Sequence, residues 1–389
     1  MSGPLDGVKV VELGVWVAAP ATGGILADWG ADVVKVEPPS GDPARMFGRM
    51  LGIDTGVNPP FEMDNRSKRS VAVDLTSDPG RNAIRELFSA ADVFVTNVRP
   101  SALRRLGLDF ETLAAQNPRL VYGLITGYGA TGPDADRAAY DVAAFWARAG
   151  LAHLLTRPGE DPPFQRGGMG DHSVGMTLAA AVCAALVSRA RTGAGQLVTT
   201  SLYRQGVYTI SFDLNTFLLT GHQIAIGRRE SMGNPCMNNY AAGDGRRFWI
   251  VGLEGERHWP ALCRSVGRHE WLTDDRFATG RSRAVNAREL IAELDALFAT
   301  RTLAEWAGAF AAEPDLFWSP INSLEDVVGD EQFHAAGGAV YVPDGDGSIP
   351  MVATPADFHG TPCAPRSAAP RLGEHTDEVL ADPAAGWRA

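Results

Sequence analysis

The sequence predicts an α/β fold in which a large Rossmann-like domain is combined with a small α+β domain. Short apolar strands alternate with helices in the first half, and near Gly227 the pattern changes to a hairpin followed by helices. After Val340 the chain has short apolar runs with Pro and Gly, as expected if it returns to the first domain. The expected segments are 1–200 for the large domain, 201–226 for a linker helix, 227–320 for the small domain and 321–389 for the returning segment.

The first half carries the strands of a parallel sheet. Strands are expected at residues 8–13, 31–37, 70–75, 93–96, 120–126 and 196–201. A helix over 20–29 has Pro20 in its first turn and stops at Gly30, and Ser77 caps a helix that runs through Ala90. Because helices of this length separate the strands, we expect βαβ units with helices on both faces.

The second half begins with a long predicted helix over 202–219. Asp244-Gly245 is a hairpin turn signal between strands at 239–242 and 248–251. Three further helices are expected at 258–266, 287–299 and 303–312. A hairpin followed by helices indicates a small α+β domain.

The composition argues against several classes of protein. A chain of 389 residues with 45% hydrophobic residues can bury a large core, and its net charge of −11 argues against nucleic acid as a partner. The four cysteines lie far apart and form no CxxC pair, so neither a zinc site nor a disulfide framework is indicated, and a reducing cytoplasm is expected. We expect neither a signal peptide nor a membrane span, because no uncharged apolar run reaches about 18 residues.

The most informative motif is GGMGDHS at 167–173, which places the carboxylate of Asp171 behind a glycine-rich turn and before an apolar helix over 173–189. The glycines lack Cβ atoms, so another molecule could approach the backbone closely. The simpler interpretation is an N-cap, the usual role of an Asp before a helix. Capping does not require the glycines, so Asp171 is the first candidate for a catalytic residue.

The usual nucleotide-binding motifs are missing. The first strand leads into GVWVAAP at 14–20 without a GxGxxG pattern, and the chain has no GxxxxGK[ST], so a dinucleotide dehydrogenase and a P-loop NTPase are not indicated. Two basic clusters could instead meet a phosphate: Arg66, Lys68 and Arg69, and Arg99, Arg104 and Arg105. The alternative is that these side chains cover a solvated surface.

Seven motifs occur in one order along the chain. They are VVEL at 10–13, ADWGADVVKVE at 27–37, NRSKRS at 65–70, NVRP at 97–100, GYG at 127–129, AYD at 139–141 and PRLGEHT at 370–376. Together they resemble the class III CoA-transferase family, which also contains the α-methylacyl-CoA racemases. The resemblance implies an interlocked homodimer in which the N-terminal half and the C-terminal tail form the large domain and CoA lies on that domain.

The resemblance also implies roles for single residues. Asp171 corresponds to the family's nucleophile, and Tyr140 to a tyrosine near the acyl group, although a core tyrosine is the alternative. The residues implied to hold CoA are Asn97 and Arg105, with Val17 and Ala18 lining its channel. No metal and no permanently bound cofactor are implied, and the partners are acyl-CoA and a carboxylic acid. Pro38 replaces a basic residue of many relatives, so the adenine must be held differently.

The implied activity is transfer of CoA between a thioester and a free acid through an aspartyl anhydride and an aspartyl-CoA thioester. The turn around Asp171 is expected to offer N–H donors to the anhydride oxygens. Related racemases carry a His at the position of Tyr140, and a tyrosine with a pKa of about 10 is a poor substitute for it. Glu254 nevertheless matches the glutamate that supports that His. The alternatives are an α-methylacyl-CoA racemase and a non-catalytic acyl-CoA-binding protein.

The segment FWARAG at 145–150 suggests which acyl group is used. It resembles the sequences of the family branch that acts on aromatic or branched 2-hydroxy acids more than those of the formate–oxalate branch. Phe145 and Trp146 are expected either to wall a bulky acyl group or to belong to the core. His172 is expected to be a packing or hydrogen-bonding residue, because adjacent helix residues point apart. The turn MGNP at 232–235 is expected to cover the acyl site.

Overall fold

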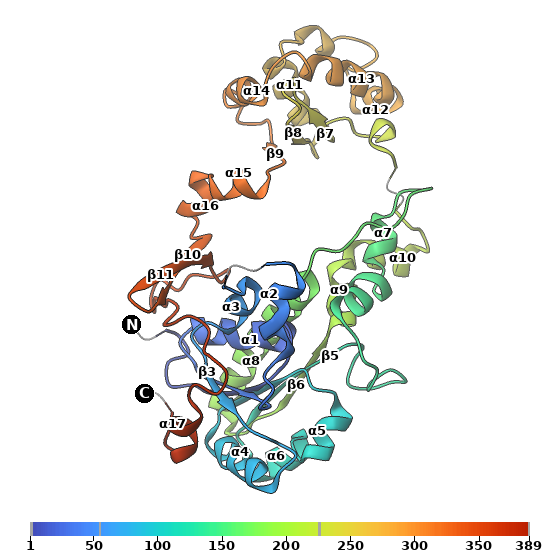
Figure 1. Ribbon diagram of the computed structural model, residues 1–389. Coiled ribbons are helices and arrows are strands. Elements are labelled where there is room, and N and C mark those ends of the chain that lie inside the picture. The colour runs from blue at the N-terminus through green and yellow to red at the C-terminus, as the bar shows by residue number, and fades with distance from the viewer. Residues whose placement is uncertain (1–2, 54–55, 225–226, 388–389) are drawn as a thin grey trace. The chain divides into compact units, whose positions relative to one another are not determined.

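The computed structural model describes residues 3–53, 56–224 and 227–387. Its contacts divide the chain into two compact units (Figure 1). The first comprises Met1–Thr156, Asp161–Ile224 and His334–Ala389, and the second comprises Arg157–Glu160 and Ala225–Phe333. The last part of the chain therefore belongs to the same unit as the first half.

A six-stranded parallel sheet forms the centre of the first unit. Its strands are β1 (Lys9–Leu13), β2 (Asp32–Glu37), β3 (Arg69–Ala72), β4 (Val93–Thr96), β5 (Val121–Thr126) and β6 (Leu197–Ser201). The order is β3-β2-β1-β4-β5-β6 with every adjacent pair parallel, as in doubly wound Rossmann folds. All six predicted strands form. Strand β3 ends earlier than predicted, because Asp74 starts a turn by accepting a hydrogen bond from the Thr76 N–H (2.9 Å).

Helices cover both faces of this sheet. One core contains Val10 of β1 together with side chains of α1 (Ala18–Asp28) and α8 (Met169–Thr192). The other core contains Val11 and side chains of the helices α4 (Asp78–Ala90), α5 (Pro100–Leu106), α6 (Phe110–Gln116) and α17 (Thr376–Ala381). Successive side chains of a strand point to opposite faces, so two neighbouring valines serve two different cores.

The C-terminal helix α17 packs against β3, the edge strand of the sheet. Its Val379 is fully buried in the second core. The Arg69 side chain donates to the Gly386 carbonyl (2.7 Å), and the Ser70 carbonyl accepts a hydrogen bond from the His375 N–H (2.9 Å). These contacts join the end of the chain to a strand from its beginning.

The predicted long helix over 202–219 is two helices, α9 (Leu202–Thr209) and α10 (Ser211–Thr220), so that prediction was wrong in part. Ile210 between them leaves the helical region with ψ of 22°. The Thr209 hydroxyl donates to the Gln205 carbonyl (2.9 Å), an interaction that bends helices. The other elements of this unit are η1 (Pro43–Met46), α2 (Phe47–Met50), α3 (Pro59–Asn65), the π-helical segment η2 (Val142–Arg148), α7 (Leu151–Leu155) and the hairpin of β10 (Ala339–Asp344) and β11 (Gly347–Val352).

The second unit has an antiparallel sheet in the order β7-β8-β9. The predicted hairpin forms from β7 (Met237–Ala241) and β8 (Arg247–Val251), and β9 (Trp318–Pro320), which was not predicted, joins β8. The helices and 3-10 turns are η3 (Arg229–Ser231), α11 (Gly255–Ser265), η4 (His269–Leu272), α12 (Gly280–Val285), α13 (Ala287–Phe298), α14 (Leu303–Phe310) and α15 (Leu324–Val328), and α16 (Glu331–Ala335) follows at the boundary of the units. Buried aromatic side chains dominate its core, with Phe248 and Phe298 5.0 Å apart between ring centroids.

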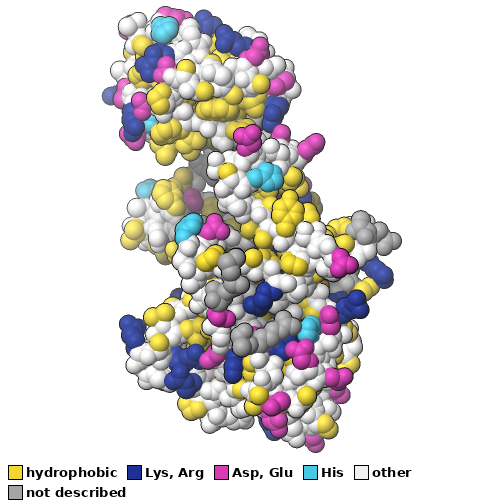
Figure 2. All heavy atoms as spheres, turned by 90° about the vertical axis from the view of Figure 1, so that its left-hand side faces the viewer, with side chains coloured by type: hydrophobic (Ala, Val, Ile, Leu, Met, Phe, Trp, Pro, Cys, Tyr) yellow, Lys and Arg dark blue, Asp and Glu magenta, His cyan; other side chains and the backbone are white. Residues whose placement is uncertain are grey.

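The charged side chains are mixed in sign over the face of the molecule in Figure 2. Lys and Arg lie among Asp and Glu there, in a chain whose net charge is −11.

Candidate active site

A cavity of about 380 Å³ lies in the first unit, beside the loops that follow β1, β4 and β5. Open parallel sheets bind ligands at this edge, outside the carboxyl ends of their strands. The predicted site residues that line the cavity are Val17, Ala18, Asn97, Tyr140 and Asp171. Arg105 is exposed in the last turn of α5 and is not among the described lining residues.

Asp171 lies in the first turn of α8, as predicted, but it is not the N-cap. The N-cap is Gly168, which adopts a left-handed conformation (φ +76°) and has no side chain to cap the helix. Asp141, which precedes η2, serves the helix end instead. Its Oδ2 accepts hydrogen bonds from the N–H groups of Gly170 (3.0 Å) and Asp171 (3.4 Å). The helix N-terminus attracts this negative charge.

Within the glycine-rich turn, Gly170 makes room for the protein itself, whereas a Cβ on Gly167 would meet no atom within 4 Å, so the close approach of another molecule to this turn stays a prediction. A Cβ on Gly170 would lie 2.2 Å from Asp141 Oδ1 and 2.4 Å from the Phe145 ring. The N–H groups of Gly170 and Asp171 already donate to Asp141, and the supply of N–H donors from this turn to an anhydride stays a prediction.

Two carboxylates therefore lie close together at the end of α8. Burial, and then the negative charge of Asp141, raise the pKa of Asp171 to about 7. Asp64 adds to this rise in pKa, and His172 opposes it. At neutral pH the Asp171 carboxylate is much more basic than an exposed aspartate, and basicity favours nucleophilic attack.

His172 points to Asp64, and its Nε2 lies 3.1 Å from Asp64 Oδ1. The prediction of a hydrogen-bonding role for this histidine is confirmed. The hydrogen bond raises the pKa of His172 above its usual value. The pairing with Asp64 favours the protonated form of His172, the residue next to the candidate nucleophile.

The aromatic side chains at the cavity are Trp16 and Tyr140, whose rings meet edge to face with centroids 6.0 Å apart. The predicted walls, Phe145 and Trp146, lie in the core of the first unit instead. Trp146 uses its indole N–H to donate to the Pro163 carbonyl (3.1 Å). The core interpretation of these two residues is confirmed, and their predicted contact with an acyl group is wrong. No sequence signal marked Trp16.

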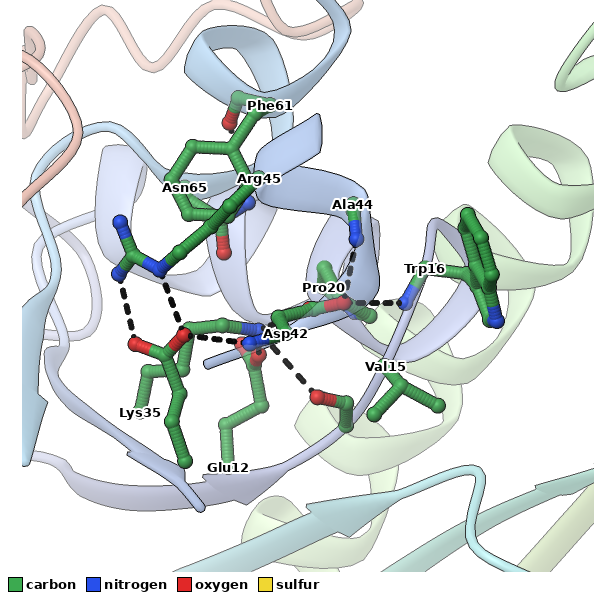
Figure 3. A network of polar contacts seen from close by, with 12 residues as sticks. Glu12, Val15, Trp16, Pro20, Lys35, Asp42, Ala44, Arg45, Phe61 and Asn65 are labelled. Carbon is green, nitrogen blue, oxygen red and sulfur yellow. Dashed lines mark hydrogen bonds and ion pairs between the residues drawn. The ribbon is translucent and has the colours of Figure 1, made fainter. Parts of the chain in front are cut away.

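The loop after β1 is held from two sides. Asn97 binds the Val15 backbone twice, accepting from its N–H (3.0 Å) and donating to its carbonyl (2.8 Å). The Trp16 N–H donates to Asp42 Oδ1 (3.0 Å), and Asp42 in turn pairs with Lys35 (2.9 Å), as Figure 3 shows. Asn97, predicted to contact CoA, thus fixes the loop that lines the cavity.

The first predicted phosphate cluster is buried, so its assignment was wrong. Each of its members forms an ion pair with a carboxylate of the sheet or of α1: Arg66 with Asp28 (2.6 Å), Lys68 with Glu12 (2.6 Å) and Arg69 with Asp32 (2.5 Å). Parallel strands are covered on both faces, so basic residues at β3 meet internal acids rather than solvent. In the second cluster, Arg99 lines the cavity and the exposed Arg104 pairs with Asp136 (3.5 Å).

Arg137 also lines the cavity, and sequence reasoning missed it. Its guanidinium lies 5.3 Å from the centroid of the Tyr128 ring. Its place just before the AYD motif at 139–141 was the available signal. Arg99 and Arg137 thus give the cavity two cationic side chains.

Two other predicted residues belong to the second unit. Glu254 is the N-cap residue of α11 and pairs with Arg257 (3.5 Å). In the expected covering turn, Asn234 donates to the Gly252 carbonyl (2.9 Å) and accepts from the Cys236 N–H (3.0 Å). These bonds fix the turn to the neighbouring strand end. Within the described ranges, no cluster of three or more His, Cys, Asp or Glu side chains could hold a metal.

Comparison with known proteins identifies clear relatives. The model of CoA-transferase family III matches residues 5–376. The (R)-2-hydroxy-4-methylpentanoate CoA-transferase of Clostridioides difficile is 34% identical, with 97% of this chain and 94% of that protein aligned. The cinnamoyl-CoA:phenyllactate CoA-transferase of Clostridium sporogenes is 32% identical over 96% of this chain and 92% of its own. The crystal structure of a CAIB/BAIF family protein from Brucella suis is similar with a TM-score of 0.85 and 32% identity, covering 98% of this chain and all of the other.

Proposed function

This chain belongs to CoA-transferase family III, and from that premise we propose that it transfers CoA between an acyl-CoA and a free carboxylic acid with Asp171 as the nucleophile. The observation that carries the proposal is the Asp171 carboxylate. It lines the cavity, and burial and the charge of Asp141 raise its pKa to about 7. Carboxylates with strongly shifted pKa values in clefts are candidates for catalysis.

The first half of the proposed reaction releases the donor acid. The Asp171 carboxylate attacks the acyl carbonyl, the C–S bond breaks, and CoA leaves as a thiolate, which gives a mixed anhydride. The thiolate then attacks the aspartyl carbonyl of the anhydride. The donor leaves as its carboxylate, and CoA is held as an aspartyl thioester.

The second half repeats these steps in reverse with the acceptor. The acceptor carboxylate attacks the aspartyl thioester, and the thiolate leaves to give a new mixed anhydride. Attack of the thiolate on the acceptor's carbonyl forms the product thioester and restores the Asp171 carboxylate. No water takes part, so the cavity must exclude water while either intermediate is present.

Asp141 has a definite effect in this scheme. Its charge opposes ionisation of Asp171, so the free carboxylate is a stronger base and the neutral anhydride and thioester relieve the repulsion. The two amides of α8 hold Asp141 in place at the same time. The repulsion between Asp141 and Asp171 is therefore greatest before attack, when both are carboxylates, and is smaller in the anhydride and the thioester, where Asp171 is neutral.

CoA is proposed to lie along the loops of the first unit, with Val17 and Ala18 in its channel and Arg105 toward its nucleotide. Arg99 and Arg137 add positive charge at the cavity, which suits phosphate groups. Tyr140 is proposed to lie beside the acyl group. The names of the two relatives from Clostridioides difficile and Clostridium sporogenes suggest branched or aromatic 2-hydroxy acids as substrates here.

A second copy of the chain is proposed to cover exposed apolar surface, in an interlocked cytoplasmic homodimer. No residue of α10 is buried, and its Phe212, Phe217, Leu218 and Leu219 are at least half exposed. Helix α8 has the length and apolarity of a membrane span, but a third of its most apolar window packs inside this unit. Large exposed apolar surfaces usually mark interfaces. Light scattering of the purified protein should give the mass of two chains.

An α-methylacyl-CoA racemase is the second candidate, because a carboxyl group with a pKa of about 7 also suits proton exchange at the α-carbon. Tyr140 is less suited than a histidine to the partner role. Incubation of a 2-methylacyl-CoA in deuterium oxide distinguishes the two. Deuterium at the α-carbon without transfer to an acceptor acid would favour the racemase.

The decisive experiment is mass spectrometry of the protein incubated with a panel of acyl-CoAs and then treated with hydroxylamine. The proposal predicts an aspartyl hydroxamate at Asp171 and none in Asp171→Asn. The variant should still bind CoA, because its side chain has nearly the same size. A protein that binds acyl-CoA, forms no adduct with any of the panel and exchanges no α-deuterium would be the non-catalytic alternative.

A further inference from the structure

We propose that Trp16 selects the acyl group and that Asp42 is a positioning residue that holds Trp16 in place. The inference rests on the proposed function, and it adds a determinant of specificity that lies outside the aspartate chemistry. Three observations carry it: the backbone conformation of Trp16, the buried network that ends at its N–H, and the position of its ring at the cavity.

The backbone of Trp16 is in the left-handed region, with φ of +64°. Residues with a Cβ rarely adopt this conformation, and a bulky residue there indicates strain that its surroundings must maintain. Ser67 is the other residue apart from glycine with positive φ in the described chain. A strained backbone directly at the candidate active site is a common sign of a functional constraint.

Asp42 supplies the maintaining contact. Its Oδ1 accepts from the N–H groups of Trp16 (3.0 Å) and Ala44 (2.9 Å), while Oδ2 pairs with Lys35 (2.9 Å). Lys35 also pairs with Glu12 (2.9 Å), and the side chains of all three charged residues are fully buried (Figure 3). Burial of so many charges stabilises a fold poorly, but it fixes geometry well when every charge has a partner.

The network therefore connects the centre of the sheet to one backbone amide at the cavity. Asn97 holds the preceding residue, Val15, through both its N–H and its carbonyl. With Val15 and Trp16 both fixed, the loop cannot change its path without breaking one of these part-buried hydrogen bonds. The backbone from which the Trp16 side chain projects is thus held by Asp42 and Asn97.

The indole ring is part of an aromatic group. It meets Phe47 (5.9 Å between centroids) and Tyr140 (6.0 Å), both edge to face. Trp16, Tyr140 and Asp171 line the same cavity. An acyl group whose carbonyl carbon is at Asp171 can pack its tail on this apolar wall, and an aromatic or branched tail gains the most from it. An acetyl group is too small to gain much.

The test compares kcat/KM for cinnamoyl-CoA and 4-methylpentanoyl-CoA with that for acetyl-CoA, at one fixed acceptor acid. Trp16→Gly removes the ring and accepts the positive φ without strain, so the loop keeps its path. We expect this variant to lower the ratio of bulky to acetyl donors at least tenfold, while Trp16→Phe lowers it less than threefold. A ratio in Trp16→Gly within threefold of wild type would overturn the selection by Trp16.

The role of Asp42 is tested by Asp42→Asn alone and together with Trp16→Gly. Positioning predicts that Asp42→Asn lowers the same ratio in the wild-type background and leaves it unchanged once the indole is absent. Equal effects in both backgrounds would show that Asp42 does not act through Trp16. If Asp42→Asn does not fold, hydrogen exchange of the wild-type Trp16 amide decides: strong protection is expected, and exchange as fast as in exposed loops contradicts the proposal.

Failure of this inference is distinguishable from failure of the proposed function. The hydroxamate at Asp171 in the wild-type protein reports the chemistry and does not depend on which donor is preferred. An adduct that forms with all donors equally well, in wild type and in Trp16→Gly, would remove the specificity role of Trp16 and leave the nucleophile in place.

Discussion

Two groups of buried carboxylates in the first unit differ in how their charges are balanced. Under the loop after β1, Glu12 and Asp42 each pair with Lys35 at 2.9 Å. At the N-terminal end of α8, the charge of Asp141 acts on Asp171, and Asp141 accepts hydrogen bonds from the backbone amides of Gly170 and Asp171. Burial opposes the charge of Lys35, yet its two acidic partners raise its pKa above the usual value, whereas the pKa of Asp171 rises because its neighbour is also an acid.

The difference supports the proposal that Asp171, rather than a residue of the Lys35 network, is the nucleophile. Buried charges that are paired with opposite charges fix the geometry of the fold, and their pairing leaves no repulsion that a reaction could relieve. When two acids are neighbours, the charge of one raises the pKa of the other, which becomes a stronger base. The repulsion is relieved when that second acid becomes a neutral anhydride or thioester. Four predictions test this division, from the largest expected effect to the smallest.

Replacing Asp171 with Asn should lower kcat by about 10⁴-fold or more, because the nucleophile is lost and the amide cannot form an anhydride. Steady-state transfer between an acyl-CoA and an acid measures this. Equilibrium binding of CoA is the control and should change less than threefold. A residual kcat within tenfold of wild type would mean that the reactive member of the pair is another residue.

Replacing Lys35 with Met should lower the free energy of unfolding by about 3–5 kcal/mol, because Asp42 loses its buried counter-ion. Urea unfolding followed by tryptophan fluorescence measures it. Arg104→Met is the matched control, since Arg104 pairs with Asp136 at the surface and such a pair contributes less than about 1 kcal/mol. Similar losses in both variants would contradict the contrast drawn above.

Replacing Asp141 with Asn should move the acidic limb of the kcat/KM profile to lower pH. The wild-type limb is expected near pH 7, where Asp171 ionises, and removal of the neighbouring negative charge lowers that pKa. The amide oxygen of Asn can still accept from the helix amides. Asp109→Asn, a change at the N-cap of α6, should leave the limb where it is.

The smallest effect concerns stability. The pKa of Asp171 is about 7 in the folded protein, whereas an ordinary aspartate has a pKa of 3.8, so the folded state binds more protons between these pH values. The contribution of Asp171 to stability is therefore present at low pH and is lost as pH rises toward 7. Asp171→Asn removes this loss, so its thermal midpoint should gain on wild type between pH 5 and pH 8. We expect the stability of the variant relative to wild type to rise by about 1–2 kcal/mol over this pH range. A difference in thermal midpoint that does not change with pH would contradict the prediction.

The sheet was predictable because its strands are local apolar runs separated by helices with clear start and stop residues, such as Ser77, whose hydroxyl accepts from the Gly80 N–H (3.2 Å). Asp171 was predictable for the same reason, as a single local motif. Partners distant in sequence were not. The sequence around Gly170 does not indicate that Asp141 lies beside it, and the sequence around Arg66 does not indicate that it forms a buried ion pair with Asp28.

Trp16 shows a further limit of sequence reasoning. Its left-handed conformation would normally call for glycine, so a local rule gives the wrong expectation. Asp42 and Asn97 hold this conformation; they are distant from one another in the sequence, and in the fold they bind the adjacent residues Trp16 and Val15. Positions where local rules fail in this way are the ones to examine for function.

The contacts of α17 with β3 have a consequence for biosynthesis. The second core includes Val379, and Arg69 binds the Gly386 carbonyl, so the first unit lacks a part of its interior until residues 376–386 have been translated. The second unit, whose strands and helices are contiguous in the chain, can mature earlier on the ribosome. Termination of translation before residue 376 should thus leave a chain with a finished second unit and an incomplete first unit, which cellular quality control would be expected to degrade.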